Sequence, residues 1–396
     1  MSLFFIVFLS MPLVDLAWWR WADVRLRKLP AKRWLRILLA VFITAQIAQF
    51  LYLLMGRGFG VKLQSPMLLL GSAYLWHLII LPVLASCTFA VFLLSAGWRG
   101  VRSITRRTAN KPATVPIAES SPAISRRQFL LTAGILAPPA LCLAATGYGI
   151  SRRDNFRTRR VEIPMRALPR ELDGMTIAHV TDIHLGKFTD ERVLKQIVAR
   201  TNDLRSDVIL MTGDLIDFDL GDLGPALEHV KKMDSPGGVF MCEGNHDLFQ
   251  GRTAFETGVK NSGVPLLLDE AATIRVRGRD VQMLGMKWDA VYRRHLERMQ
   301  PLRDPDAFQI LLAHHPHAFD PAAEFGIPLT LAGHTHGGQL MLTPDFGAGP
   351  MMFKYWSGLY RNDDAALVVS NGVGNWFPLR VNAPAEILHI TLRAVT

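Results

Sequence analysis

The stretch MTIAHVTDIH, from Met175 to His184, decides the fold of the C-terminal part of this chain. Apolar, β-prone residues lead into an Asp-x-His pair and then into Leu185-Gly186. This order predicts a buried strand that delivers two side chains to a loop at its carboxyl end, where sites in α/β sheets usually lie. Because residues two apart on an extended chain point the same way, Asp182 and His184 can reach one ion together.

Four more strand-like runs end in residues of the same kind. In chain order, they are Val208–Thr212 before Gly213-Asp214, Val239–Cys242 before Glu243-Gly244-Asn245-His246-Asp247, Ile310–Ala313 before His314-His315-Pro316, and Leu329–Ala332 before Gly333-His334-Thr335-His336. Glycines beside these residues permit tight turns and a close approach of the backbone. Five strand–loop junctions that carry Asp, His or Asn predict a shared metal site at the carboxyl edge of a sheet.

Helical and strand-like segments alternate through the same part of the chain. Apolar spacing predicts helices over Asp190–Leu204, with Asp190 as the N-cap, and over Leu223–Met233, Thr253–Asn261 and Tyr292–Met299. Further strands are predicted at Val161–Ile163 (an edge), Val264–Asp269, Ala272–Val276 paired with Val281–Gly285, Leu367–Val369 and Ile387–Leu392. The alternation predicts an α/β fold of two sheets flanked by helices.

The motif order D-x-H, G-D, G-N-H-D, H-H-P and G-H-T-H resembles that of the calcineurin-like metallophosphoesterase superfamily, over roughly residues 173–395. Within the superfamily, the block His334–Gln339 and the later Pro378-Leu379-Arg380 are most similar to the exported, membrane-associated YkuE/YaeI-type phosphodiesterases. The resemblance implies a four-layer β-sandwich of two mixed sheets flanked by helices. It also implies a metal-dependent hydrolase that acts on phosphoester or phosphodiester bonds.

The resemblance further implies a site for two divalent ions. It assigns to one ion the ligands Asp182, His184 and His336, and to the other ion the ligands Asn245, His314 and His334. It assigns to Asp214 the role of a ligand that bridges both ions. The attacking group would be a hydroxide between ions that typically lie ~3.5–4 Å apart. Oxygen and nitrogen donors suit Mn²⁺, Fe or Zn²⁺, and they indicate no preference for a metal that binds sulfur. His315 could replace His314 as a ligand, although the H-x-P pattern of the family favours His314.

Other residues have expected roles around these ligands. By the resemblance, His246 acts near the leaving-group oxygen, as a general acid or as a transition-state stabiliser. We expect Asp247 to orient His246, as carboxylates often orient imidazoles. Arg380, together with Asn245, is a candidate to bind a second phosphate or another substrate anion; the alternative is an ordinary surface arginine. Asp217 is expected to cap a loop.

The first 150 residues have the composition of a membrane module. Residues 1–98 contain about three apolar spans, near Met1–Trp19, Ile37–Met55 and Met67–Trp98, and Pro82 is expected to kink the third. Residues 99–127 form a basic polar linker, and residues 128–150 form a fourth apolar segment. Residues 151–396 then form the catalytic domain.

The fourth segment has two interpretations. Ser125-Arg126-Arg127-Gln128-Phe129-Leu130 resembles a twin-arginine export signal followed by a hydrophobic region. The alternative is a fourth transmembrane helix with ordinary flanking arginines, because export signals of this kind normally stand at the N-terminus. Both interpretations insert residues 128–150 into a membrane.

The distribution of charge predicts orientation and argues against nucleic acid as a partner. Seven basic residues in Arg20–Arg36 and seven in Arg99–Arg127 place these loops inside and residues 151–396 in the periplasm of a bacterial-type inner membrane. Five arginines at positions 152, 153, 157, 159 and 160 favour the opposite orientation. Residues 157–396 carry 26 basic and 30 acidic residues and are therefore net negative. The positive net charge of +10 thus comes from the first 156 residues. A nuclease is therefore disfavoured.

These observations lead to one main functional hypothesis and to several alternatives. The main hypothesis is a membrane-anchored dimetal phosphoesterase whose substrate is a phosphate ester, with lipid and nucleotide-lipid substrates included. The first alternative is a pyrophosphatase of lipid A biosynthesis that resembles the UDP-2,3-diacylglucosamine hydrolases. The lesser alternatives are a nuclease and a non-catalytic membrane scaffold.

Overall fold

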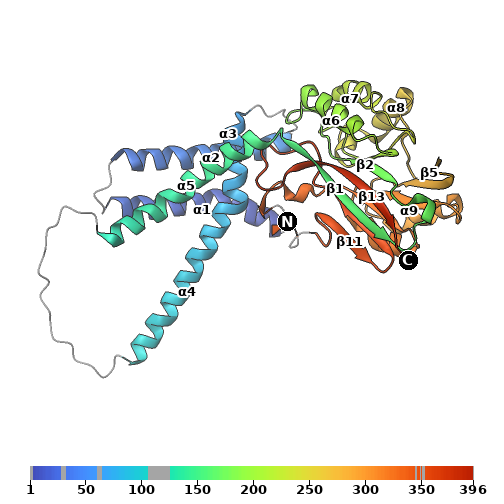
Figure 1. The fold of residues 1–396 in the computed structure, drawn as a ribbon. Helices are drawn as coiled ribbons and strands as arrows, with labels where there is room; N and C mark the ends of the chain where they lie inside the picture. The colour runs from blue at the N-terminus through green and yellow to red at the C-terminus, as the bar shows by residue number, and fades with distance from the viewer. Residues whose placement is uncertain are drawn as a thin grey trace, which may run out of the picture. The chain divides into compact units, whose positions relative to one another are not determined.

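The computed structural model describes residues 3–27, 33–59, 65–105, 125–343, 346–347, 349 and 353–395. The chain divides into two compact units, Met1–Ile150 and Ser151–Thr396, which are described separately (Figure 1). Residues 106–124 of the expected linker lie outside the described part of the chain. The beginning of that linker is helical, since the preceding helix continues to Thr105.

The first unit is built from helices. They are α1 (Leu3–Leu26), α2 (Arg33–Phe59), α3 (Met67–Leu75), the π-helical turn η1 (Trp76–Ile80), α4 (Leu81–Thr105) and α5 (Arg126–Arg152). Within the described residues, three stretches are long and apolar enough to cross a membrane: Arg33–Leu54, Met67–Trp98 and Arg126–Arg152. The first expected span, Met1–Trp19, stays a prediction. The π-helical turn ends at Ile80, two residues before Pro82, where a kink is expected in the third span.

A buried polar cluster joins α1 to the π-helical turn. The carboxylate of Asp15 accepts a hydrogen bond from Trp76 Nε1 at 2.7 Å and meets His77 Nε2 at 2.8 Å. All three side chains are buried. Because an ionisable side chain among apolar helices requires partners, this cluster explains how α1 accommodates an aspartate.

Two mixed sheets form the second unit, as the sequence predicts. The first sheet has the strand order β1-β13-β2-β3-β4 and the second the order β11-β12-β8-β7-β6-β5; β9 and β10 pair separately. The strands are β1 (Phe156–Met165), β2 (Thr176–Val180), β3 (Val208–Thr212), β4 (Val239–Cys242), β5 (Glu270–Val276), β6 (Arg279–Gly285), β7 (Phe308–Leu312), β8 (Leu329–Ala332), β9 (Met341–Thr343), β10 (Phe346–Gly347), β11 (Gly358–Asn362), β12 (Ala365–Val369) and β13 (Ala385–Ala394).

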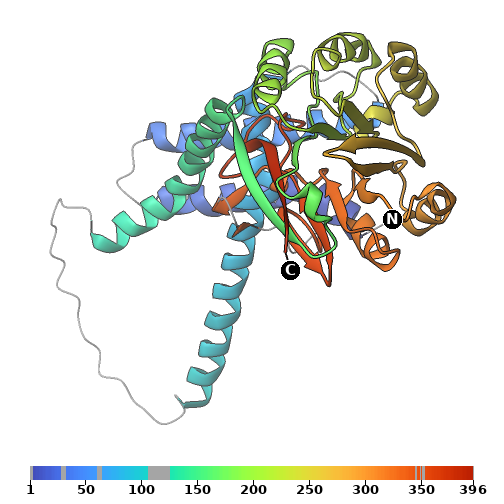
Figure 2. The ribbon, with the colours of Figure 1, turned by 45° about the vertical axis from the view of Figure 1, so that its right-hand side comes forward.

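Helices cover the outer faces of the two sheets. They are α6 (Glu191–Asp203), α7 (Leu223–Val230), α8 (Arg252–Ser262), α9 (Tyr292–Met299) and α10 (Phe319–Glu324), with short turns η3 (Arg170–Leu172), η4 (Leu220–Asp222), η5 (His246–Leu248), η6 (Gln300–Leu302), η7 (Pro316–Ala318) and η8 (His336–Gly338). Figure 2 shows α6, α7 and α8 side by side, in accord with their mutual contacts. The result is the four-layer sandwich that the resemblance implies.

Separate apolar clusters hold the layers together. The cluster between the sheets joins residues such as Ile177 and Leu210 of the first sheet to Met283 and Leu331 of the second. A second cluster packs α6, α7 and α8 on the first sheet, and a third packs α9 and α10 on the second. Burial on both faces explains why the central parallel strands have continuous apolar sequences.

One strand expectation is wrong. Residues 264–269, predicted as a strand, run beside β4 with only an isolated bridge between Met241 and Leu266. Pro265 lacks the N–H that a regular ladder needs at its position, although its carbonyl accepts from Met241 N at 3.0 Å. The predicted edge strand is confirmed, since β1 borders only β13 in its sheet.

Candidate active site at the carboxyl ends of the strands

The five strand–loop junctions meet at one place. Parallel strands β2, β3 and β4 of the first sheet and β7 and β8 of the second end there, and each is followed by candidate ligands. Backbone hydrogen bonds fix the junctions to one another: Asp182 N donates to Gly213 O and Gly333 N to His314 O, both at 3.0 Å. Side chains that are far apart in sequence are thereby assembled by the sheets themselves.

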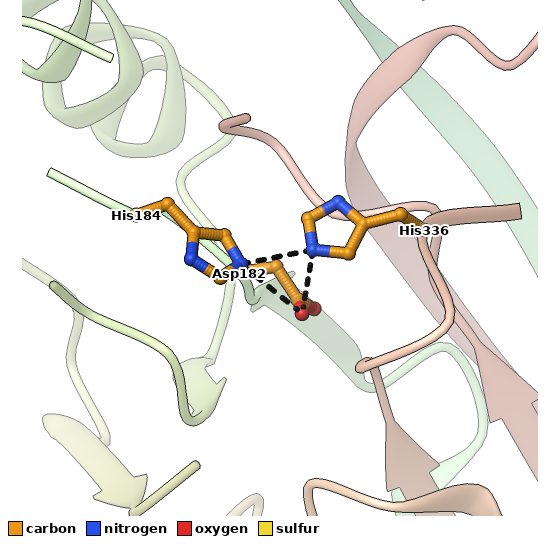
Figure 3. Close-up of side chains that lie close together, drawn as sticks. All are labelled: Asp182, His184 and His336. Atoms are coloured by element: carbon orange, nitrogen blue, oxygen red, sulfur yellow. Dashed lines mark hydrogen bonds and ion pairs between the residues drawn. The ribbon is translucent and has the colours of Figure 1, made fainter. Parts of the chain in front are cut away.

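Asp182, His184 and His336 form the first group of donors (Figure 3). His336 Nε2 lies 3.1 Å from Asp182 Oδ1 and 2.9 Å from His184 Nε2. All three side chains are buried. Two ring nitrogens and one carboxylate oxygen directed at a common point fit a divalent cation that takes nitrogen and oxygen donors.

Asp214, His314 and His334 form a second group, and Asn245 joins it. His314 Nε2 lies 3.1 Å from Asp214 Oδ2 and 3.2 Å from Asn245 Oδ1. The same Asn245 oxygen lies 2.9 Å from His334 Nδ1. His315 is directed elsewhere, because its Nδ1 accepts the backbone N–H of His317 at 3.2 Å.

The carboxylate of Asp214 lies between the two groups. Its Oδ2 is 3.1 Å from His314 Nε2 in the second group and 3.4 Å from His184 Nε2 in the first. Its Oδ1 accepts the backbone N–H of His246 at 2.8 Å. This position fits a carboxylate shared by two cations.

Five of the seven candidate ligands share an uncommon backbone conformation. Asp182, His184, Asp214, His334 and His336 have φ angles of 56°, 48°, 53°, 68° and 52°, in the left-handed region. Such conformations are costly for residues other than glycine, and they cluster where function requires them. The backbone strain therefore lies at five of the seven positions that the side-chain geometry identifies.

Charge interactions inside the site are strong because the groups are buried. Burial opposes protonation of His184 and His314, but nearby carboxylates, that of Asp214 first, outweigh it and raise the pKa of His184 to about 10 and that of His314 to about 9. Burial lowers the pKa of His336 to about 4 and that of His334 to about 2. Burial also opposes ionisation of Asp214, yet the imidazoles hold its pKa well below the usual range. The site is thus built around carboxylate charge that cations can balance.

The position of His246 corrects one expectation. Asp217, expected only to cap a loop, is the carboxylate beside its ring: Nδ1 of His246 lies 3.2 Å from Asp217 Oδ1 and donates to the Asp217 carbonyl at 2.7 Å. Asp247, expected to orient His246, instead accepts backbone hydrogen bonds at 2.8–3.1 Å from Asp214, Leu215, Ile216 and Gly244. Asp247 therefore supports the loop that carries Asp214.

Arg380 corrects a second expectation. Its side chain is 2% exposed, and its guanidinium donates to the carbonyls of Asn371, Gly374 and Ala383. Its Nη2 also lies 3.1 Å from His336 Nδ1, on the far side of that ring from Asp182. Arg380 is thus enclosed among backbone carbonyls behind His336, which is neither the anion clamp nor the surface residue that we considered.

Aromatic side chains that the motifs did not reveal border the site. Trp288 packs on His334 and His314, with ring centroids 5.1 and 5.2 Å apart. Its backbone N–H donates to the buried Glu243 at 2.9 Å. Trp288 follows strand β6 closely, so the rule that sites lie at strand ends could have identified it.

The sequence also resembles known proteins. The family description "Calcineurin-like phosphoesterase" matches residues 175–338. The Bacillus subtilis (strain 168) protein named "Uncharacterized metallophosphoesterase YkuE" is 31% identical over 294 residues, 68% of this chain and 98% of that protein. The Campylobacter jejuni "Uncharacterized metallophosphoesterase Cj0846" is 27% identical over 326 residues, 79% of this chain and 81% of that protein.

A further relative is named as a transmembrane protein. The Danio rerio "Transmembrane protein with metallophosphoesterase domain" is 30% identical over 250 residues, 59% of this chain and 56% of that protein. These matches and the two-sheet fold agree with the motif order quoted at the outset. The chain belongs to the calcineurin-like metallophosphoesterase family and is a hydrolase of phosphoester bonds.

Proposed function

We propose that residues 151–396 form a dimetal phosphoesterase that hydrolyses phosphomonoester, phosphodiester or pyrophosphate bonds. The observation that carries this proposal is the carboxylate of Asp214, shared between two groups of buried Asp, His and Asn donors. Asp182, His184 and His336 would hold one ion, and Asn245, His314 and His334 the other. Mn²⁺, Fe or Zn²⁺ fit these donors, and such ions supply an activated water and neutralise phosphoryl charge.

His246 has the geometry of a proton donor to the leaving group. Since a carbonyl oxygen only accepts, the ring nitrogen Nδ1 must carry a proton toward Asp217 O, which leaves Nε2 for the substrate. The Asp217 carboxylate oxygen Oδ1 lies 3.2 Å from the same Nδ1, so a proton for the leaving group would be carried on Nε2. In hydrolysis, water oxygen bonds to phosphorus, the bond from phosphorus to the leaving oxygen breaks, and His246 gives that oxygen a proton.

The compartment of the site selects between two classes of substrate. A periplasmic catalytic unit, which the loop charges favour, would act on phosphoesters of the cell envelope. A cytoplasmic unit would favour a pyrophosphatase acting on a nucleotide-lipid such as UDP-2,3-diacylglucosamine, for which the candidate membrane helices of the same chain are the supporting observation. Alkaline phosphatase and a cytoplasm-active reporter, each fused after Thr396, distinguish the two locations.

The proposed chemistry is tested with the purified full-length chain. We expect hydrolysis of p-nitrophenyl phosphate or bis(p-nitrophenyl) phosphate with Mn²⁺ or Zn²⁺, and loss of activity on chelation. Asp214→Asn should lose both activity and bound metal, whereas His246→Asn should keep the metal and lose about 100-fold or more in kcat. Full activity in Asp214→Asn would refute the shared-carboxylate site.

A further inference from the structure

Two phenylalanines leave half of their surface in water beside the site. Phe218 and Phe249 are each 52% exposed, although their rings contact each other with centroids 5.7 Å apart. All other Phe, Tyr and Trp side chains that the structure describes in residues 151–396 are buried or half-buried. Exposed apolar area is unfavourable in water, at about 25 cal/mol per Å², and the pair does not serve the buried clusters.

Both phenylalanines belong to loops that carry site residues. Phe218 directly follows Asp217 in the loop after β3, and Phe249 directly follows the turn that begins at His246. The Phe249 ring lies 4.6 Å from the His246 ring, centroid to centroid. The half-buried Trp376 lies 6.5 Å from the same imidazole. The His246 side of the site is therefore bordered by apolar rings.

We infer that the Phe218–Phe249 pair binds an apolar chain on the leaving-group side of the substrate. This inference rests on the proposed function, in which His246 protonates the leaving oxygen. Because this pair, called here the apolar ledge, lies beside His246, it would contact the alcohol that leaves. The phosphate group of the substrate would then lie toward the candidate metal ligands. The substrate class is thus a phosphate ester of a lipid-like alcohol, which water splits into the free alcohol and a phosphate product.

The covalent structure of the chain supports an amphiphilic substrate. The candidate membrane helix Arg126–Arg152 is followed by only three residues, 153–155, before β1 begins at Phe156. The covalent link between that helix and the first strand of the catalytic unit is therefore at most about 11 Å long when extended. A membrane surface is where esters of long-chain alcohols concentrate, which favours a substrate chain over a soluble protein as the occupant of the ledge.

The test compares substrates that differ only in chain length. The full chain in lipid nanodiscs is assayed with methyl, butyl and hexyl phosphate, and with Phe218→Ser/Phe249→Ser as the variant. The matched control is Leu302→Ser, which removes a 47% exposed apolar side chain from η6. Each substrate partitions into the nanodisc equally for all three proteins. A change in the kcat/KM ratio of hexyl over methyl phosphate from one protein to another therefore reports the contribution of the ledge.

We expect this ratio to be about tenfold or more in the unaltered chain and in Leu302→Ser, and to be several-fold lower in the double variant. A second readout is the affinity of hexylphosphonate relative to methylphosphonate by calorimetry, which should change in parallel. Hydrolysis without chain-length dependence, or equal dependence in the double variant, overturns the inference and leaves the proposed function intact. Hydrolysis of no phosphate ester at all overturns both.

Discussion

Asp217 holds His246 by two contacts to one atom. The Nδ1 of His246 lies 2.7 Å from the carbonyl oxygen of Asp217 and 3.2 Å from its carboxylate Oδ1. The carbonyl requires a proton on Nδ1, and the carboxylate beside the same atom helps to orient the ring. The same carboxylate lies 3.5 Å from His184 Nδ1, so it touches a candidate ligand and a candidate acid together.

Asp217→Asn tests this coupling through the leaving group. The variant keeps the carbonyl contact but weakens the side-chain contact that orients the ring, so proton transfer from His246 to the leaving oxygen should be slower. We expect kcat to fall about 10–100-fold for alkyl phosphates, whose alkoxides leave poorly, and much less for p-nitrophenyl phosphate. An equal loss with both substrates would instead indicate damage to the metal site through His184.

Asp247→Ala should destabilise the catalytic unit. The substitution leaves four backbone N–H groups of the site loops without their acceptor, in a buried place. We expect a loss of about 3 kcal/mol or more in the free energy of unfolding, seen as a lower Tm. Asp203→Ala, at an exposed carboxylate at the end of α6, is the control and should leave Tm nearly unchanged. A Tm for Asp247→Ala equal to that of the unaltered chain would refute this role.

Two glycine substitutions should affect the two ions differently. A Cβ at Gly333 would lie 2.0 Å from Asp182 Oδ2, and a Cβ at Gly244 would lie 2.2 Å from Asp214 Oδ1. Gly333→Ala should therefore displace a ligand of one ion, whereas Gly244→Ala should displace the carboxylate shared by both. Metal analysis of the purified proteins checks the expected order of metal content, unaltered above Gly333→Ala above Gly244→Ala. Gly224→Ala, where a Cβ meets nothing within 4 Å, is the control.

The candidate ligands were predictable because all of them follow strands that the sequence reveals. A short apolar, β-prone run identifies each strand, and the carboxyl ends of parallel strands share one edge, so the sequence alone brings Asp182 and Asp214 together. The adjacent β2 and β3, paired in parallel from Ile177 and Val208 onward, satisfy this condition. Here the local pattern determines the tertiary contact.

The supporting residues were not predictable in this way. Asp217 and Asp247 are both near His246, one in space and one in sequence, and the path of the loop after β3 decides which of them reaches the ring. Arg380 looks like an available cation in sequence, but its burial depends on how the backbone carbonyls of residues 371–374 curl around it. The path of a loop and the burial of a side chain such as Arg380 depend on many residues that are distant in sequence. A local sequence pattern therefore does not predict them.

Stability of the catalytic unit should depend on pH through His179. Burial lowers the pKa of this histidine to about 3, while its Nε2 contacts Thr212 Oγ1 at 2.8 Å. At pH values below the unfolded-state pKa of about 6.5, His179 binds a proton in the unfolded chain but stays neutral in the folded chain. Stability is therefore fully present above that pH and is lost as pH falls toward 3, by at most about 1.4 kcal/mol per pH unit from this group.

His179→Gln isolates that contribution. Glutamine can contact Thr212 but does not titrate, so the variant should be less sensitive to acid than the unaltered chain. The difference in Tm between the two proteins, measured from pH 7.5 to pH 4.5, should shift in favour of His179→Gln as pH falls. All other titrating groups are common to both proteins, so parallel Tm curves would show that His179 does not contribute.

Asp15 should be essential to the helical unit. Asp15→Ala leaves Trp76 Nε1 and His77 Nε2 buried without the carboxylate that both contact. Leaving a buried polar group without its partner costs about 1–3 kcal/mol, so the Tm of the detergent-solubilised chain should fall clearly. Asp15→Asn keeps an oxygen that can accept from Trp76, and it should lose less. Ser95→Ala, on an exposed face of α4, is the control, and equal Tm values for Asp15→Ala and Ser95→Ala would show that the cluster does not join the helices.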